Sequence, residues 1–283
     1  MLPNCQLSCR VCNTNSNRPE RRSTQGAQCG TGKDSRCCDK EPSCAVWASY
    51  GECDENPNYM LSKCKLSCHA CRTTFPKPKS QTCRDNGMTQ EVRQMFLNMH
   101  NRYRSMVAKG EAIDGAGGYA PRAASMKKMM YDCDIEESAM RHAVGCRWGH
   151  SAQHERKDLG ENLYYSGNRQ MNKVNAAEDA CKLWFGELAE RGVGQEDNVL
   201  TQEVWNKPGQ IGHYTQMVWQ DSYRLGCYVN WCDSMTYVVC QYGPQGNWIG
   251  DPIYDTGNPC TTDDDCMCTN CRCSKEEALC IIQ

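Results

Sequence analysis

Cysteine is the residue type that most constrains this chain. The sequence has 283 residues, and 24 of them are cysteines. In a reducing cytosol so many side chains would remain reactive thiols, whereas an oxidising compartment joins them in disulfides. We therefore expect a secreted, extracellular protein whose stability depends largely on disulfides.

The charge and hydropathy of the chain exclude two classes of partner. The formal net charge is -2 at pH 7, so no basic field attracts nucleic acid. The sequence also lacks an apolar run of the ~20 residues that a membrane crossing needs, and we expect no membrane span.

A three-cysteine pattern occurs twice. MLPNCQLSCRVC at 1–12 and MLSKCKLSCHAC at 60–71 have their cysteines in the same register, so residues 1–12 form the C-terminal part of a truncated repeat. The first residues also lack the basic start and apolar segment of a secretory signal peptide. We infer that Met1 is not the natural start and that a preceding segment with the signal peptide is missing.

The complete copy spans residues 38–71, and its spacing resembles the ShKT domain, which is named for a sea anemone toxin. In that family three disulfides replace the core that so short a module cannot build. The resemblance implies the pairs Cys38–Cys71, Cys44–Cys64 and Cys53–Cys68.

Two segments around this module predict linkers. Residues 13–37 are polar and poor in apolar side chains, and Cys29 and Cys37 could close a small loop there. Residues 72–82 contain Pro76 and Pro78 and predict a short stiff spacer.

From Cys83 the pattern becomes that of a mixed domain. Apolar residues at steps of three and four predict a helix that begins near Thr89 and further helices over 135–146 and 174–188. After Asn198 the sequence turns to short β-rich runs separated by Gly and Asp turns, at 213–220, 225–231 and 235–242. Helices followed by strands predict an α+β domain over 83–254, arranged as a helix/sheet/helix sandwich.

Four segments of this domain carry a family resemblance. They are HNRYR at 100–104, GENLY at 160–164, GHYTQMVW at 212–219 and VVCQYGPQGNWIG at 238–250. In this order they resemble the signatures of the CAP superfamily, which includes cysteine-rich secretory proteins, wasp venom allergens and plant pathogenesis-related proteins. WFGELAERGVGQ and IYDTGNPC are similar to the nematode venom allergen-like, or Ancylostoma-secreted-protein, group.

The resemblance implies a metal-competent central cleft formed by His150, Glu161, Glu187 and His213. Imidazole nitrogens and carboxylate oxygens are suitable ligands for Zn²⁺ or another divalent cation. Structural roles stay open beside this one, because Glu187 could lie on a solvated helix face and His213 could be hydrogen-bonded within the core. For His100 and Arg104, which lie four residues apart in the first helix, we expect a structural tie of this helix to neighbouring loops and no catalytic role.

The remaining cysteines predict further cross-links. The resemblance implies Cys146–Cys232 and Cys227–Cys240, and elimination then pairs Cys133 with Cys181, leaving Cys83 without an obvious partner. The tail at 255–283 contains six cysteines in C-x-C and C-x-x-C spacings that suit a metal cluster or three disulfides. The oxidising compartment favours the disulfides.

Three functions are open at this point. The resemblance implies a non-enzymatic extracellular protein that binds and modulates host immune or signalling partners. A sterol or fatty-acid carrier is the second; its candidate lining residues are Met126, Met129, Met130 and Trp205, which core packing also explains. A metal-dependent hydrolase is the third, but the family has no generally accepted reaction and we expect no enzyme. The sequence does not indicate the oligomeric state.

Overall fold

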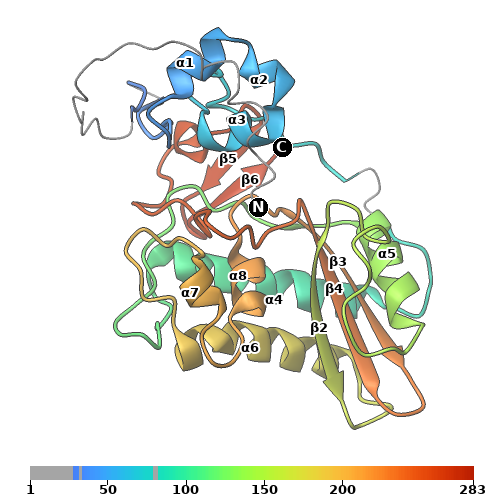
Figure 1. Cartoon of the computed structure of the whole chain (residues 1–283). Coiled ribbons are helices and arrows are strands. Elements are labelled where there is room, and N and C mark those ends of the chain that lie inside the picture. Colours follow the sequence, from blue (N-terminus) through green and yellow to red (C-terminus); the bar gives the residue numbers. More distant parts are fainter. Residues whose placement is uncertain (1–27, 32–33, 79–81) are drawn as a thin grey trace, which may run out of the picture.

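A computed structural model describes residues 28–31, 34–78 and 82–283 (Figure 1). The truncated repeat at 1–12 and most of the predicted linker lie outside the described residues. Two parts are visible: a small helical module at residues 44–63 and a larger mixed domain, with the C-terminal tail beside both (Figure 1). No helix in these ranges has both the length and the apolar character for crossing a membrane.

A four-stranded sheet forms the centre of the larger domain. The order is β1-β3-β4-β2, with β1 at Met130–Tyr131, β2 at Gly160–Ser166, β3 at Arg224–Trp231 and β4 at Thr236–Gly243. Strand β4 pairs antiparallel with both β2 and β3, and β1 is parallel to β3. Every residue of β4 is buried, as expected for a strand with both faces covered.

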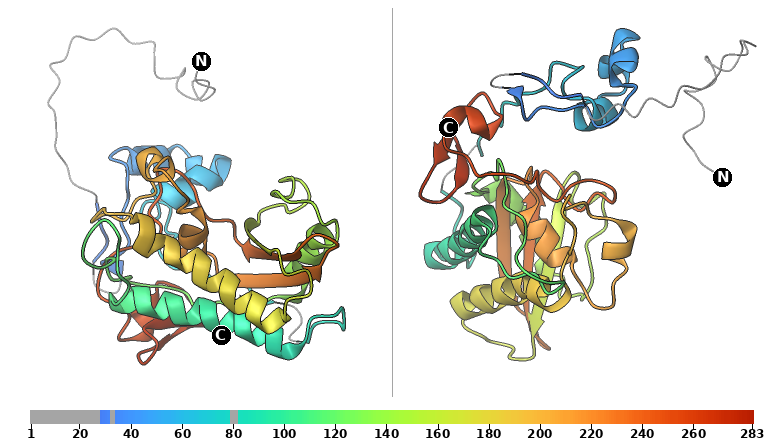
Figure 2. Two further views of the ribbon diagram at one scale, coloured as in Figure 1. Left: turned by 90° about the horizontal axis from the view of Figure 1, so that it is seen from below. Right: turned by 90° about the vertical axis from the view of Figure 1, so that its left-hand side faces the viewer.

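Helices cover both faces of this sheet. α5 (Cys133–Ala143) packs on β3 and β4 from one side. α4 (Gln90–Lys109), α6 (Lys173–Arg191) and α8 (Gly212–Val218) pack together on the other side, with the short α7 (Gln202–Trp205) near them (Figures 1 and 2). The predicted helix/sheet/helix sandwich is therefore confirmed.

Short polar side chains begin the three long helices. The hydroxyl of Thr89 accepts from the amide of Val92, and the carboxylate of Asp132 accepts from two amides in the first turn of α5. Asn172 caps α6 in the same way. Gly110 ends α4 with φ of 73°, a left-handed conformation that glycine adopts readily. The N-terminal caps explain why the three helices begin close to the predicted positions.

Two secondary-structure predictions were wrong. Residues 213–220, predicted as a strand, begin in helix α8. Almost every residue of this short segment is buried, polar ones included, so it lacks an exposed face that could separate helix from strand. The helix predicted over 135–146 ends at Ala143, and Cys146 lies outside it with φ of 51°.

The small module consists of three short helices, α1 (Cys44–Ser49), α2 (Glu52–Glu55) and α3 (Pro57–Lys63). The disulfides Cys44–Cys64 and Cys53–Cys68 are present as predicted. The pair Cys38–Cys71 is wrong: Cys71 bonds to Cys37, and Cys38 bonds to Cys29. A β-bridge pairs Cys29 with Cys38, and neighbouring side chains in an extended segment point to opposite sides, so Cys37 faces Cys71.

The C-terminal tail bonds to the larger domain and to the spacer that follows the small module. It contains a 3₁₀ helix (Asp263–Cys266) and the hairpin of β5 (Cys271–Ser274) and β6 (Leu279–Ile282). The backbone of Cys280 exchanges 2.8 Å hydrogen bonds with Met126 and Lys128, while Asn270 bonds both backbone groups of Phe75 in the spacer. The six tail cysteines form three disulfides as expected: Cys260–Cys273, Cys266–Cys280 and Cys268–Cys271.

The cysteines of the larger domain give one further correction. Cys146–Cys232 and Cys227–Cys240 are present as predicted, but Cys133 bonds to Cys83 and not to Cys181. The pairing of Cys133 by elimination was wrong because it did not count Cys83, which precedes α4, among the cysteines that bond within this domain. Cys181 points into the core from α6 as a free thiol, and burial raises the pKa of this thiol.

Candidate functional site

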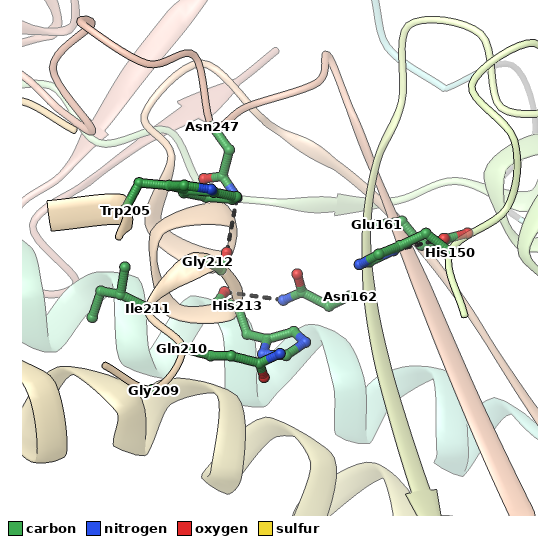
Figure 3. A pocket seen from close by; sticks show the side chains of 10 residues that line it. All are labelled: His150, Glu161, Asn162, Trp205, Gly209, Gln210, Ile211, Gly212, His213 and Asn247. Carbon is green, nitrogen blue, oxygen red and sulfur yellow. Dashed lines mark hydrogen bonds and ion pairs between the residues drawn. The ribbon is translucent and has the colours of Figure 1, made fainter. Parts of the chain in front are cut away.

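A pocket of about 290 Å³ opens between β2, α7 and the N-terminal end of α8. Most of its lining side chains are polar (Figure 3). The lining residues are His150, Glu161, Asn162, Trp205, Gly209, Gln210, Ile211, Gly212, His213 and Asn247.

Glu161 on β2 fixes His150 and the loop that carries it. Its Oε1 lies 3.0 Å from Nδ1 of His150 and accepts from the amide of Ser151 at 2.9 Å. Its Oε2 accepts from the hydroxyl of Ser151 at 2.7 Å and from Nε2 of Gln241 at 2.8 Å. The carboxylate therefore serves as a fully hydrogen-bonded acceptor.

These contacts determine the ionisation of Glu161. Burial disfavours the carboxylate, but hydrogen bonds from His150, Gln241 and Ser151 outweigh it and lower the pKa of Glu161 to about 2. Glu161 is thus an anion at neutral pH that favours a proton on Nδ1 of His150.

Glu187 on α6 does the same for His213 from the opposite side. Its Oε1 lies 2.6 Å from Nδ1 of His213, and its Oε2 accepts from the backbone amides of His213 and Tyr214 at 2.9 and 3.0 Å. The same carboxylate therefore orients the imidazole and satisfies orphan amides in the first turn of α8. The indole of Trp184 lies parallel to the His213 ring, with centroids 6.0 Å apart.

Both histidines thus have Nδ1 facing a carboxylate, which leaves Nε2 with its lone pair available. Figure 3 shows the two imidazoles on the two sides of Asn162. Nε2 of His150 and of His213 makes no hydrogen bond to any described residue. The arrangement can supply two nitrogen ligands to a cation, with each carboxylate behind its histidine.

The four predicted site residues do not meet as one compact set of ligands. His150, Glu161 and His213 line the pocket, whereas Glu187 lies behind His213. Within the described residues, the only group of three or more His, Cys, Asp or Glu residues with ligand atoms within 4.8 Å of one another is a set of tail cysteines, which are all in disulfides. The geometry therefore shows each carboxylate orienting one imidazole and leaves the two Nε2 atoms as candidate ligands.

Sequence reasoning missed most of the neutral lining residues, although the motifs contained three of them. Asn162 follows Glu161 in GENLY, Gly212 precedes His213 in GHYTQMVW, and Asn247 lies in VVCQYGPQGNWIG. Of the proposed lipid-lining residues, only Trp205 lines the pocket. Met126 and Met129 lie in the core, and Met130 packs against the buried cluster of the tail.

Comparison with known proteins identifies both parts of the chain. Residues 97–242 match the model of the cysteine-rich secretory protein family, CAP, and residues 36–71 match the ShK domain-like model. The chain belongs to the CAP family.

Its relatives include secreted nematode proteins. The Ancylostoma secreted protein of Ancylostoma caninum is 43% identical over 257 residues, which cover 90% of this chain and 53% of that protein. The crystal structure of NaASP2 with Zn²⁺ is 54% identical with a TM-score of 0.65, covering 70% of this chain and all of that one. The crystal structure of Na-ASP-1 is 46% identical with a TM-score of 0.67, covering 74% of this chain and 52% of that one. The chain thus spans about half the length of the first and third of these relatives.

Proposed function

We propose that the chain is a secreted, extracellular, non-enzymatic binding protein whose pocket takes a divalent cation on His150 and His213. The observation that carries this proposal is the pairing of each Nδ1 with a carboxylate, which leaves two imidazole nitrogens for a metal. NaASP2, which is 54% identical, has been solved with Zn²⁺. The cation then fixes the pocket, and the surface around it contacts extracellular partner proteins of a host.

Binding fits the pocket better than hydrolysis does. The described residues that line it include no Ser, Thr, Cys or Lys that could act as a nucleophile. Glu161, with its pKa near 2 and both oxygens hydrogen-bonded, is a poor general base at neutral pH. A small, mostly polar pocket is also poorly suited to a sterol or fatty acid.

The metal is tested by zinc titration of the metal-free chain in a calorimeter. We expect one zinc ion per chain and a loss of affinity of about tenfold or more in His150→Ala and in His213→Ala. His154→Ala is the matched control, because His154 is exposed and does not line the pocket. Unchanged zinc affinity in the His150→Ala/His213→Ala double variant, with a normal melting temperature, would place the metal elsewhere and contradict the proposal.

A second experiment tests whether the chain binds extracellular partner proteins of a host. The full chain is labelled and titrated onto host leukocyte membranes and onto immobilised plasma proteins. We expect saturable binding that an excess of unlabelled chain displaces. Linear, non-displaceable uptake on both materials would argue against an extracellular binding protein.

A further inference from the structure

One wall of the pocket is an aromatic side chain that the metal site does not use. Trp205 lies on α7, which Thr201 caps through a hydrogen bond to the amide of Val204. The indole packs directly over Gly212, where an added Cβ would meet the ring at 3.1 Å (Figure 3). The ring remains 42% exposed, so it is held in place while part of it faces the pocket and solvent.

Neutral amide side chains line the pocket together with this ring, and hydrogen bonds hold two of them in place. Asn247 donates to the carbonyl of Gly212 at 2.8 Å and accepts from the hydroxyl of Thr215 at 2.7 Å, which leaves its second N–H for a ligand. Asn162 donates from Nδ2 to the carbonyl of His213 and to the hydroxyl of Tyr242, which leaves its oxygen as an acceptor. In Figure 3 this oxygen points away from His213.

The charge and polarity of the lining side chains indicate which class of ligand the pocket can bind. Neither Lys nor Arg is among the described lining residues, so a strongly anionic ligand finds no counter-charge. The apolar lining side chains are Trp205 and Ile211, too few for an acyl chain or a sterol. Gln210 adds a further exposed amide at the edge. A ligand with one C–H face and several hydroxyl groups matches an indole beside fixed donors and acceptors.

We propose that this pocket binds a neutral pyranose, such as the terminal sugar of a glycan, stacked on Trp205 and hydrogen-bonded to Asn162 and Asn247. The volume of about 290 Å³ lies at the lower end of the range for small-molecule sites and suits a single sugar ring. The ligand uses the pocket of the proposed function but does not depend on the cation.

The test uses the full chain in EDTA and four probes, the methyl glycosides of glucose, galactose, mannose and N-acetylglucosamine. Saturation-transfer NMR detects binding, and titration gives the affinity. We expect at least one probe to bind, Trp205→Ala to weaken it about tenfold or more, and Trp205→Phe to weaken it less. Trp248→Ala is the matched control: this indole is 54% exposed and near the pocket but does not line it, so we expect a change below about twofold.

Three results would overturn the proposal, provided that melting temperatures show folded variants. They are binding of none of the four glycosides, equal affinity in Trp205→Ala and the wild type, and, in a parallel titration of two further probes, tighter binding of a sulfated sugar or of palmitate than of any glycoside. The glycoside titration is made in EDTA, which removes zinc. A negative result in it is therefore independent of a negative result in the zinc titration, which depends on His150 and His213.

Discussion

Replacing Arg104 with leucine is expected to lower the free energy of unfolding by about 4 kcal/mol. Arg104 lies on α4, and its side chain is fully buried. Its guanidinium donates to the carbonyls of Lys127, Met217, Trp219 and Gln220 at 2.8 to 3.1 Å. Leucine leaves these buried acceptors without the donor, and each unsatisfied group costs about 1–3 kcal/mol.

The measurement is guanidinium chloride unfolding with disulfides intact, followed by tryptophan fluorescence. Arg102→Leu is the matched control because Arg102 is exposed on the same helix, and we expect a change below about 0.5 kcal/mol. Burial lowers the pKa of Arg104 to about 9, so the side chain is still a cation at neutral pH. A loss below about 1 kcal/mol for Arg104→Leu would show that water or a shifted backbone replaces these bonds.

Arg104 also anchors the end of helix α8. The carbonyl of Met217 lies in the last turn of α8, the carbonyls of Trp219 and Gln220 follow the helix, and His213 lies at its start. Glu187 caps the start and Arg104 anchors the end, so two charged side chains from neighbouring helices hold α8. The prediction that His100 and Arg104 tie their helix to neighbouring loops is confirmed for Arg104. His100 instead bonds to Phe96 in its own helix and to Tyr242 on strand β4.

The architecture was predictable because periodicity and motifs are local. The apolar stripes located α4 and α6, and strands β3 and β4 lie within a residue of the runs predicted for them. The sandwich followed from the order of these elements. Helix α8 was not predictable in this way, because what favours a helix there is a carboxylate from Glu187, 26 residues earlier in the chain.

The site and the disulfide pairing could likewise be predicted only in part from the sequence. Motifs indicated which histidines and acids belong to the pocket, but only the fold shows that Glu161 and Glu187 bond to the Nδ1 atoms and do not meet at a shared centre. Cysteine pairing depends on which side of a segment each sulfur faces. Neighbouring Cys37 and Cys38 could not be told apart by spacing, and a β-bridge decided between them.

Acid is expected to destabilise the protein through a second buried group, His100. Its imidazole is fully buried on α4, with Nδ1 2.7 Å from the carbonyl of Phe96 and Nε2 2.9 Å from the hydroxyl of Tyr242. The carbonyl can only accept, so Nδ1 carries the proton and Nε2 accepts from Tyr242. Because the Tyr242 hydroxyl also accepts from Asn162, a proton on Nε2 would direct two donors at this oxygen and leave the Tyr242 O–H without its acceptor.

The direction of the effect follows from the depressed pKa of this histidine. Burial lowers the pKa of His100 from 6.5 to about 4. Between these values the unfolded chain binds the proton and the folded chain does not. The contribution of His100 to the free energy of unfolding is therefore fully present above pH 6.5. It falls by about 3 kcal/mol as the pH drops towards 4.

Comparing wild type with His100→Gln isolates this contribution from that of the carboxylates, which titrate in both proteins. The free energy of unfolding is measured with denaturant at pH 7, 6, 5 and 4. Between pH 7 and pH 4 it should fall by about 3 kcal/mol more in wild type than in His100→Gln, whatever the difference between the two proteins at pH 7. His154→Gln, at an exposed position, should follow the wild-type curve. Parallel curves for wild type and His100→Gln would mean that the pKa of His100 is the same in the folded and the unfolded chain, which would contradict this prediction.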